Sequence, residues 1–364
     1  MSANSLVVLF LRGGADGLAL APSLDHGRMR ELRPTLAEEP LEAGLSVGLH
    51  HALAPLVPLI QNHELDLVVG VGSDDDTRSH FEAQARMESA GPTRQVDASG
   101  WIARHLASRP GPAPGPLAAL SIGAMVPASL RGASATALES VEELVRGAPD
   151  DAMLDALGEL YEGLEDARPL ANAGKDAVHV ARALRALALA DHPRTSLYPE
   201  GALGRRLAEV AMLLQHRNEL GVEVVALDQD GWDTHFVEAT LLAENAAALA
   251  HGVVALRDDL GPSWADTTVV ILTEFGRRAY ENVSKGTDHG RASVAIVAGG
   301  ALPKAGARGD WGALDDSALE GPGDLPVTLD YRVWLADLVR GALGNPHIDA
   351  VFPGLRLRAR TSSG

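Results

Sequence analysis

The chain has 364 residues, 46% of them hydrophobic, and a mean hydropathy of +0.01, which is enough apolar material for a sizeable core. Its formal net charge of −18 repels phosphate backbones and anionic membranes, so we expect neither nucleic-acid nor membrane-surface binding. The absence of cysteine excludes disulfides, thiol nucleophiles and cysteine-ligated zinc.

The N-terminal segment predicts a first strand rather than an export signal. In "MSANSLVVLFLRGG" no basic residue precedes the apolar run, and no small-residue cleavage site follows it. No apolar run elsewhere approaches the ~18–20 residues that a membrane span needs. These features predict a soluble, cytoplasmic protein.

Five short runs rich in Val, Ile and Leu predict the strands of a sheet. They span residues 5–11, 65–72, 222–228, 267–275 and 293–300. Continuous apolarity is typical of strands that are covered on both faces. Segments with helical periodicity lie among these runs, at residues 48–65, 201–220 and 237–260. The alternation predicts an α/β fold, with a doubly wound, mostly parallel sheet sandwiched by helices in one domain over residues 1–364.

Two regions interrupt this alternation. Residues 127–200 are rich in Ala, Leu and Glu with Pro-Gly punctuation, which predicts a helical insertion or cap. Residues 301–328 are rich in Gly, Pro and Asp, and we expect an irregular excursion before a last helix at 329–343. The "PGPAPGP" at 110–116 predicts a turn or short linker inside the fold.

Polar clusters follow four of the predicted strands, and ligands of open α/β sheets bind beyond the carboxyl ends of the strands. The clusters are "RGGADG" (12–17), "SDDDTRSH" (73–80), "QDGWDTH" (229–235) and Glu274 with "FGRR". A fifth cluster, "GTDHG" (286–290), leads into the last strand. If the sheet is parallel, these clusters gather at one edge. Carboxylates combined with imidazoles suit zinc, manganese or a similar divalent ion.

Several of these clusters also fit a purely structural interpretation. Asp16 and Asp233 suit the caps of following helices, and "SDDDTRSH" suits a helix start. The "GTDHG" segment is the strongest single signal, because Asp-His between glycines is poor as structure but good as a ligand pair. Glu274 ends a buried strand and is costly to bury alone, so a metal or an arginine is expected beside it.

The chain resembles a known bacterial family in the order and spacing of its motifs, over about residues 5–355. The matching motifs are "LVVLFLRGGADGL", "GLHHALAPLVPL", "TRSHFEAQARME", "GWDTH", "TEFGRRAYEN" with "GTDHG", and "DLPVTLDYR". That family is the domain of unknown function 1501. It is grouped with the alkaline-phosphatase-like superfamily of phosphatases, sulfatases, phosphodiesterases and cofactor-independent phosphoglycerate mutases. The resemblance therefore implies an alkaline-phosphatase-like fold.

The resemblance also implies roles for individual residues. Ser79, or Thr77 in its place, resembles the nucleophile at a helix N-terminus, where N–H groups stabilise a developing anion. Arg78 and His80, in the same segment, are further catalytic candidates. The implied metal ligands are Asp16, Asp233, His235, Glu274, Asp288 and His289. Arg12 and Arg277, with Arg78, are candidates to hold an anionic substrate, although exposed salt bridges are the ordinary role of arginines.

The chain departs from the superfamily pattern at four points. Glu274-Phe275 stands in place of an Asp-His pair, so one histidine ligand is missing; either Asp288 compensates or one metal site is weak or absent. The Cys/Ser-Pro-Arg signature of sulfatases is absent around Ser79. Most family members are thought to be exported by the Tat route, and this N-terminus carries no such signal. Ala19 stands where a polar residue is expected.

These observations predict a metal-dependent hydrolase or transferase that acts on a phosphate ester, less readily a sulfate ester, through a Ser/Thr nucleophile. The substrate is a small anionic molecule, and the cofactor is one or two divalent ions, zinc or manganese first, with calcium, magnesium or iron as alternatives. A different, biosynthetic reaction on the same scaffold and a non-catalytic, metal-stabilised binding protein are the alternatives. The exact substrate and the oligomeric state do not follow from the sequence.

Overall fold

The computed structural model describes residues 4–92, 99–147, 149–163, 168–300, 302 and 306–356. All five predicted apolar runs form buried strands. These strands are β1 (Ser5–Leu11), β2 (Leu65–Gly72), β5 (Val224–Gln229), β6 (Thr267–Thr273) and β9 (Ser293–Gly299). Four shorter strands complete the main sheet: β3 (Ala119–Ile122), β4 (Ala135–Leu138), β10 (Gly306–Arg308) and β11 (Leu329–Asp330). The short strands β3 and β4 were not among the predicted runs.

The sheet is mostly parallel, with the order β10-β2-β9-β6-β1-β5-β3-β4 and with β11 paired to β2. Strand β1 lies between β5 and β6 and runs parallel to both. Only β9 runs against its neighbours, β2 and β6. The start of β9 therefore lies at the same edge as the carboxyl ends of β1, β5 and β6. This reversal brings the "GTDHG" segment to the other polar clusters, and a fully parallel sheet would have placed it at the opposite edge.

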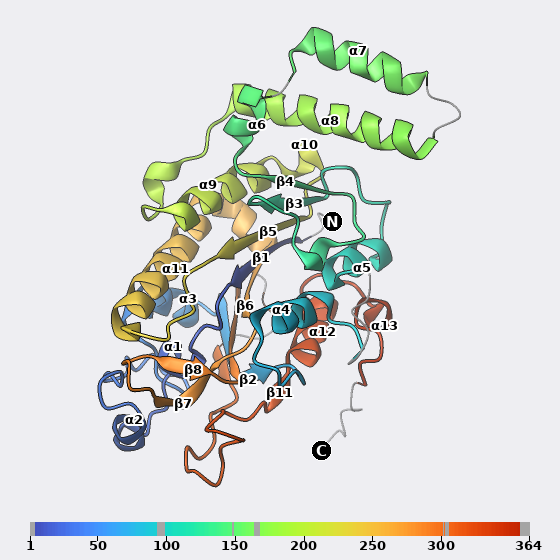
Figure 1. The fold of residues 1–364 in the computed structure, drawn as a ribbon. Coiled ribbons are helices and arrows are strands. Elements are labelled where there is room, and N and C mark those ends of the chain that lie inside the picture. Colours follow the sequence, from blue (N-terminus) through green and yellow to red (C-terminus); the bar gives the residue numbers. More distant parts are fainter. Residues whose placement is uncertain are drawn as a thin grey trace.

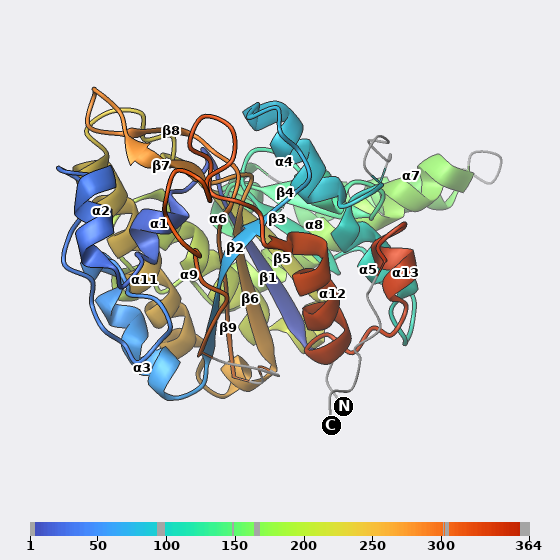
Figure 2. The same ribbon diagram turned by 90° about the horizontal axis from the view of Figure 1, so that it is seen from below.

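Alternate side chains of each strand pack into two cores on opposite faces of the sheet. In β1, Val7, Leu9 and Leu11 belong to one core, whereas Leu6, Val8 and Phe10 belong to the other. Because both faces are covered, the strands are apolar throughout. The helices of the first face are α1 (Gly17–Leu20), α2 (His26–Leu32), η1 (His51–Leu56), α3 (Val57–Gln61), α9 (Ala202–Gln215) and α11 (Glu238–Leu260). Those of the second are α4 (His80–Ser89), α5 (Trp101–Ser108), α12 (Tyr331–Gly341) and α13 (Ile348–Val351), and Figure 2 shows the sheet between the two groups.

One stretch of the described chain, Glu238–Asp266, is long and apolar enough to cross a membrane by length and composition. It consists of α11 and the short helix η5 (Gly261–Asp266). Leu249, Val253 and Leu256 of α11 are completely buried against the first face of the sheet. This is the position of a core helix, which is compatible with the predicted soluble protein.

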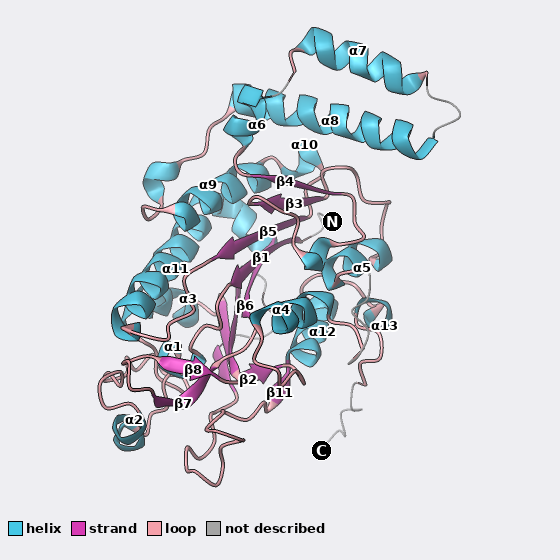
Figure 3. Cartoon of the chain, in the orientation of Figure 1, coloured by secondary structure: helices cyan, strands magenta, loops and turns pink. Residues whose placement is uncertain are grey.

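The region predicted as a helical insertion contains β4 as well as helices. The helices are α6 (Val141–Gly147), α7 (Asp151–Glu162) and α8 (Arg168–Ala190). Helices α7 and α8 pair and project beyond the β4 edge of the sheet (Figures 1 and 3). In Figures 1 and 2, which differ by a 90° turn, they lie far from the hairpin of β7 (Arg277–Glu281) and β8 (Thr287–His289). They therefore do not cap the edge at which the polar clusters meet.

Candidate metal centre

Three histidines and one aspartate meet at the carboxyl edge of the sheet. One ligand atom each of His80, Asp233 and His289 lies within 4.8 Å of the other two. His289 Nε2 is 3.2 Å from Asp233 Oδ1, and His80 Nε2 is 3.5 Å from Asp233 Oδ2. His235 adjoins this cluster, with its Nε2 2.9 Å from His289 Nε2 and 3.1 Å from Asp233 Oδ1. Four possible ligands thus come from three separate segments of the chain.

The other ring nitrogen of each histidine faces an oxygen acceptor. His80 Nδ1 is 2.8 Å from Glu274 Oε1, and His289 Nδ1 is 3.0 Å from the carbonyl oxygen of Arg78. His235 Nδ1 lies 3.6 Å from Asp288 Oδ1. These acceptors favour a proton on Nδ1 and turn the Nε2 lone pair toward the cluster, as in histidines that bind metals.

Two features of this arrangement point to a cation. His80 Nε2 is shielded from solvent and makes no hydrogen bond within the described residues. His235 and His289 bring their Nε2 atoms to 2.9 Å, where two lone pairs repel unless a proton or a cation lies between them. A divalent ion would satisfy both conditions, so the donor set fits zinc or manganese.

The protonation states of Asp233 and His289 suit metal binding, whereas the raised pKa of His80 means that an ion would have to displace a proton from its Nε2. Burial would raise the pKa of Glu274, but hydrogen bonds from His80 and Gln84 hold it below its usual value. The hydrogen bond to Glu274 raises the pKa of His80. Burial and nearby Arg277 lower the pKa of His289, which favours its neutral form. Burial would raise the pKa of Asp233, but the hydrogen bond from Arg277 lowers it, so Asp233 is an anion.

Gly13 and Gly14, which follow β1, allow the segments of the centre to pack closely. A side chain at Gly13 would place its Cβ 2.4 Å from the backbone nitrogen of Asp233, and one at Gly14 would come equally close to the ring of Phe275. Both glycines have positive φ angles, 120° and 69°. The Gly13 N–H also donates to Glu274 Oε1 at 2.9 Å. The glycine pair therefore serves the geometry of the centre.

Strained backbone flanks two of the histidines. Arg78 has a φ of 54° two residues before His80, and Val237 has a φ of 50° two residues after His235. A left-handed conformation is costly for a β-branched residue such as valine, about 1–3 kcal/mol. The β7–β8 hairpin holds this conformation, because the Val237 N–H donates to the Ser284 carbonyl at 3.3 Å. Strain of this kind gathers at functional sites.

The family model described as "Protein of unknown function (DUF1501)" matches residues 67–332, which include His80, Asp233, His235, Glu274 and His289. The chain belongs to the DUF1501 family. No curated protein matches the chain. The match runs from β2 into α12 and so covers most of the sheet.

Two predicted ligands of this DUF1501 protein lie behind the histidines instead of facing the cluster. Glu274 is 1% exposed and accepts hydrogen bonds from Gly13, His80 and Gln84. Asp288 accepts from Asn282 and Arg278, each at 3.2 Å, and faces the far side of His235. Glu274 therefore orients the imidazole of His80, and Asp288 lies 3.6 Å behind His235 without a hydrogen bond to it.

Asp16, predicted as a metal ligand, is not among the residues that the structure brings together at His80, Asp233 and His289. Its side chain is fully buried and forms an ion pair with Arg33 Nη1 at 2.8 Å. It also caps α1 by accepting from the Ala19 N–H at 3.0 Å. Thr287 Oγ1 is 3.3 Å from Asp16 Oδ2 and 2.7 Å from Glu238 Oε2. Burial, and then the negative charge of Asp16, raise the pKa of Glu238.

The arginines predicted to bind substrate are engaged inside the protein. Arg277 is completely buried and donates to Asp233 Oδ1 at 2.8 Å. Its guanidinium also donates to four backbone carbonyls, those of Gly13, Gly14, Trp232 and Thr287. Arg12 pairs with Glu88 at 2.5 Å and with Asp228 at 3.0 Å. Arg277 therefore holds the backbone of the centre together, and Arg12 makes both of its ion pairs through Nη2.

The three candidates before His80 differ in what their side chains do. Thr77 Oγ1 donates to Asp75 Oδ2 at 3.0 Å and accepts from the Ser79 N–H at 3.2 Å. The guanidinium of Arg78 binds the buried carboxylate of Asp324, so its contribution to the centre is its carbonyl. Ser79 is the N-cap of α4, is partly exposed, and makes no capping bond with its side chain. Of the two hydroxyls, that of Ser79 is the one without a hydrogen bond to the described residues.

The structure adds two residues that sequence reasoning did not assign. Phe275 packs its ring against His80 and His289, with centroid distances of 4.9 and 4.8 Å. Gln84 donates to Glu274 Oε1 at 2.9 Å. Gln84 lies four residues after His80 on α4, and that helical spacing is a signal that could have found it.

Proposed function

We propose that this DUF1501 protein is a divalent-metal-dependent hydrolase or transferase acting on phosphate esters, and less readily on sulfate esters. The observation that carries the proposal is the convergence of imidazole Nε2 atoms on Asp233, each imidazole being held from behind by an oxygen acceptor. His80, Asp233 and His289 would hold one ion, with His235 beside them. When bound, a divalent ion supplies positive charge that stabilises an anionic transition state.

In this proposal Ser79 is the nucleophile. It precedes the ten residues of α4, whose first N–H groups favour an anion at that point. Ser79 Oγ would attack phosphorus while the ester bond breaks, and the departing alcohol would take a proton. Water would then hydrolyse the phosphoserine and release phosphate. His80 follows Ser79 directly, which keeps the attacking hydroxyl beside the cluster.

The finer assignment, to the alkaline-phosphatase-like superfamily, is part of the same proposal. The resemblance of the motifs and the position of the cluster at the carboxyl edge of a sheet covered by helices support it. We propose one ion rather than two. Asp16 is paired with Arg33, and Phe275 stands where the superfamily has a histidine, so a second ion would lack two of its ligands.

Exposed phenylalanines suggest the class of ester. The chain has five phenylalanines, and three of them are buried. The other two, Phe81 and Phe236, are 86% and 61% exposed and directly follow His80 and His235. Val283, fully exposed, lies beside Ser284, which accepts the N–H of Val237. Apolar side chains around a polar cluster favour an ester whose alcohol is aromatic or alkyl.

The test is hydrolysis of p-nitrophenyl phosphate by protein loaded with zinc or manganese. We expect turnover that a chelator abolishes and that added ion restores. Ser79→Ala should retain the ion but lose activity by about 100-fold or more. Ser196→Ala, in an exposed segment of another part of the chain, is the control. A metal-loaded protein that hydrolyses neither phosphate nor sulfate esters would overturn the proposal.

A further inference from the structure

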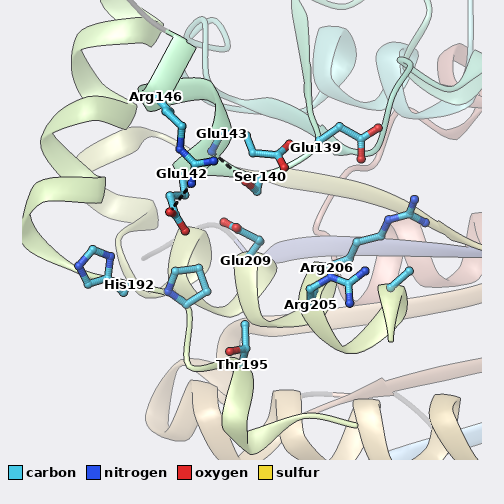
Figure 4. Close-up of a pocket in the computed structure, with 12 residues that line it drawn as sticks. Glu139, Ser140, Glu142, Glu143, Arg146, His192, Thr195, Arg205, Arg206 and Glu209 are labelled. Carbon is cyan, nitrogen blue, oxygen red and sulfur yellow. Dashed lines mark hydrogen bonds and ion pairs between the residues drawn. The ribbon is translucent and has the colours of Figure 1, made fainter. Parts of the chain in front are cut away.

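A cavity of about 470 Å³ lies between α6 and the start of α9 (Figure 4). Its lining comes from residues 139–146, 192–195 and 202–209, none of which belongs to the metal centre. Helix α6 follows β4, and Arg206 of α9 donates to the carbonyl oxygen of Asp228 near the end of β5, at 2.7 Å. The cavity thus lies at the carboxyl edge of the sheet, toward β4, where α/β proteins bind ligands.

A buried acid with an open oxygen lines this cavity. Glu209, on α9, is 6% exposed, and its Oε2 accepts from the Val141 N–H at 3.3 Å. Its Oε1 makes no hydrogen bond within the described residues, although the cavity reaches the side chain. Burial, and then the charges of Glu142 and Glu143, raise the pKa of Glu209 to about 7. A carboxyl group buried at this cost is well placed to receive a cationic group.

Charged side chains of both signs surround Glu209. In Figure 4, Glu142 lies on one side of Glu209 in its ion pair with Arg146, and Arg205 and Arg206 lie on the other, with Glu139 above Arg206. Arg206 is engaged by the carbonyl of Asp228. The guanidinium of Arg205 makes no hydrogen bond or ion pair to any described residue, and the side chain is exposed. The cavity therefore exposes the open oxygen of Glu209 and the unengaged guanidinium of Arg205 to the same space.

We propose that this cavity binds a small zwitterion of the amino-acid type, with its ammonium group on Glu209 and its carboxylate on Arg205. The volume falls within the range of small-molecule sites. A simple amine would leave Arg205 without a partner, and a simple acid would bring a negative charge against Glu209. Both contacts are charge-assisted hydrogen bonds, and guanidinium matches a carboxylate with two parallel donors.

The test is thermal denaturation and calorimetric titration of the full chain with the common L-amino acids, one at a time. We expect at least one of them to raise the melting temperature in a saturable manner. Its decarboxylated amine and its deaminated acid should not bind. Glu209→Gln and Arg205→Gln should each weaken binding by about tenfold or more. Glu162→Gln, an exposed control on α7, should leave binding unchanged.

Glu209→Gln keeps the shape of the side chain, and Arg205→Gln shortens an exposed one. The melting temperatures of both variants without ligand show whether they fold. The proposal is overturned if no amino acid binds, if binding survives both substitutions, or if the amine alone binds as tightly as the amino acid. None of these outcomes depends on the metal centre or on ester hydrolysis.

Discussion

Two groups of charged residues lie near the same edge of the sheet and differ in where their charges are balanced. Asp16 is wholly buried, and Arg33 balances it at 2.8 Å inside the protein. Asp233 has a side chain that is 48% exposed; its Oδ1 accepts from Arg277, and its Oδ2 lies 3.5 Å from His80 Nε2. The residue types are similar, but the Asp16 pair is complete, whereas His80 Nε2 has no hydrogen-bond partner among the described residues. The partner, rather than the residue type, separates a structural carboxylate from a candidate ligand.

The largest effect that we predict follows from breaking the ion pair of Asp16 and Arg33. Asp16→Asn leaves the guanidinium of Arg33 buried without a counter-charge, which should lower the free energy of unfolding by about 3–5 kcal/mol. Metal affinity of the folded protein should not change. Urea denaturation and metal titration below the unfolding transition measure the two quantities, with the exposed Asp337→Asn as control. If Asp16→Asn stays stable but loses the ion, Asp16 is a ligand after all.

A smaller effect, on metal affinity, is expected from replacing Glu274, which accepts a hydrogen bond from the far side of the His80 ring. Glu274→Gln keeps the shape of the side chain but removes the carboxylate that holds His80 Nδ1, so metal affinity should fall by about 10–100-fold. Glu238→Gln replaces another buried glutamate of the same edge and should leave the affinity unchanged. Competition with a chelator of known affinity measures both. Equal affinities in the two variants would mean that Glu274 does not orient a ligand.

The smallest effect is expected at Thr77, whose hydroxyl both donates and accepts a hydrogen bond within its own turn. Thr77 bonds only to Asp75 and to the Ser79 N–H, so Thr77→Ala should cost about 1 kcal/mol of stability and leave hydrolysis intact. The rate of ester hydrolysis by Thr77→Ala is compared with that of Ser79→Ala under identical metal loading. Loss of activity in Thr77→Ala, with Ser79→Ala still active, would exchange the roles of the two residues.

The fold could be predicted where the pattern was long and apolar. The five runs that form β1, β2, β5, β6 and β9 all have the continuous apolarity of strands covered on both faces. Strands β3 and β4 have only four residues each, "ALSI" and "ATAL", too few to separate from a helix or a loop. The direction of β9 has no signature in its composition, because an apolar run is the same in either orientation.

The candidate site could be predicted as a set of residues but not as a set of roles. The resemblance pointed to Asp233 and His289, which the structure brings together, and it placed His80 among the catalytic candidates although its Nε2 faces the cluster. Roles depend on partners that are remote in the chain. Arg277 is 44 residues from Asp233, and Glu274 accepts from Gly13 across 261 positions. No local spacing encodes such contacts, so burial and exposure of these side chains had to come from the structure.

Everything proposed for the centre depends on whether His80, Asp233 and His289 hold a divalent ion. The most direct measurement is the metal content of the purified chain after loading with zinc or manganese and removal of free ion, beside the variant His289→Gln. We expect about one ion per chain in the natural sequence and almost none in His289→Gln, with both proteins folded. A natural chain that retains no ion, or a variant that retains as much as the natural chain, would contradict it.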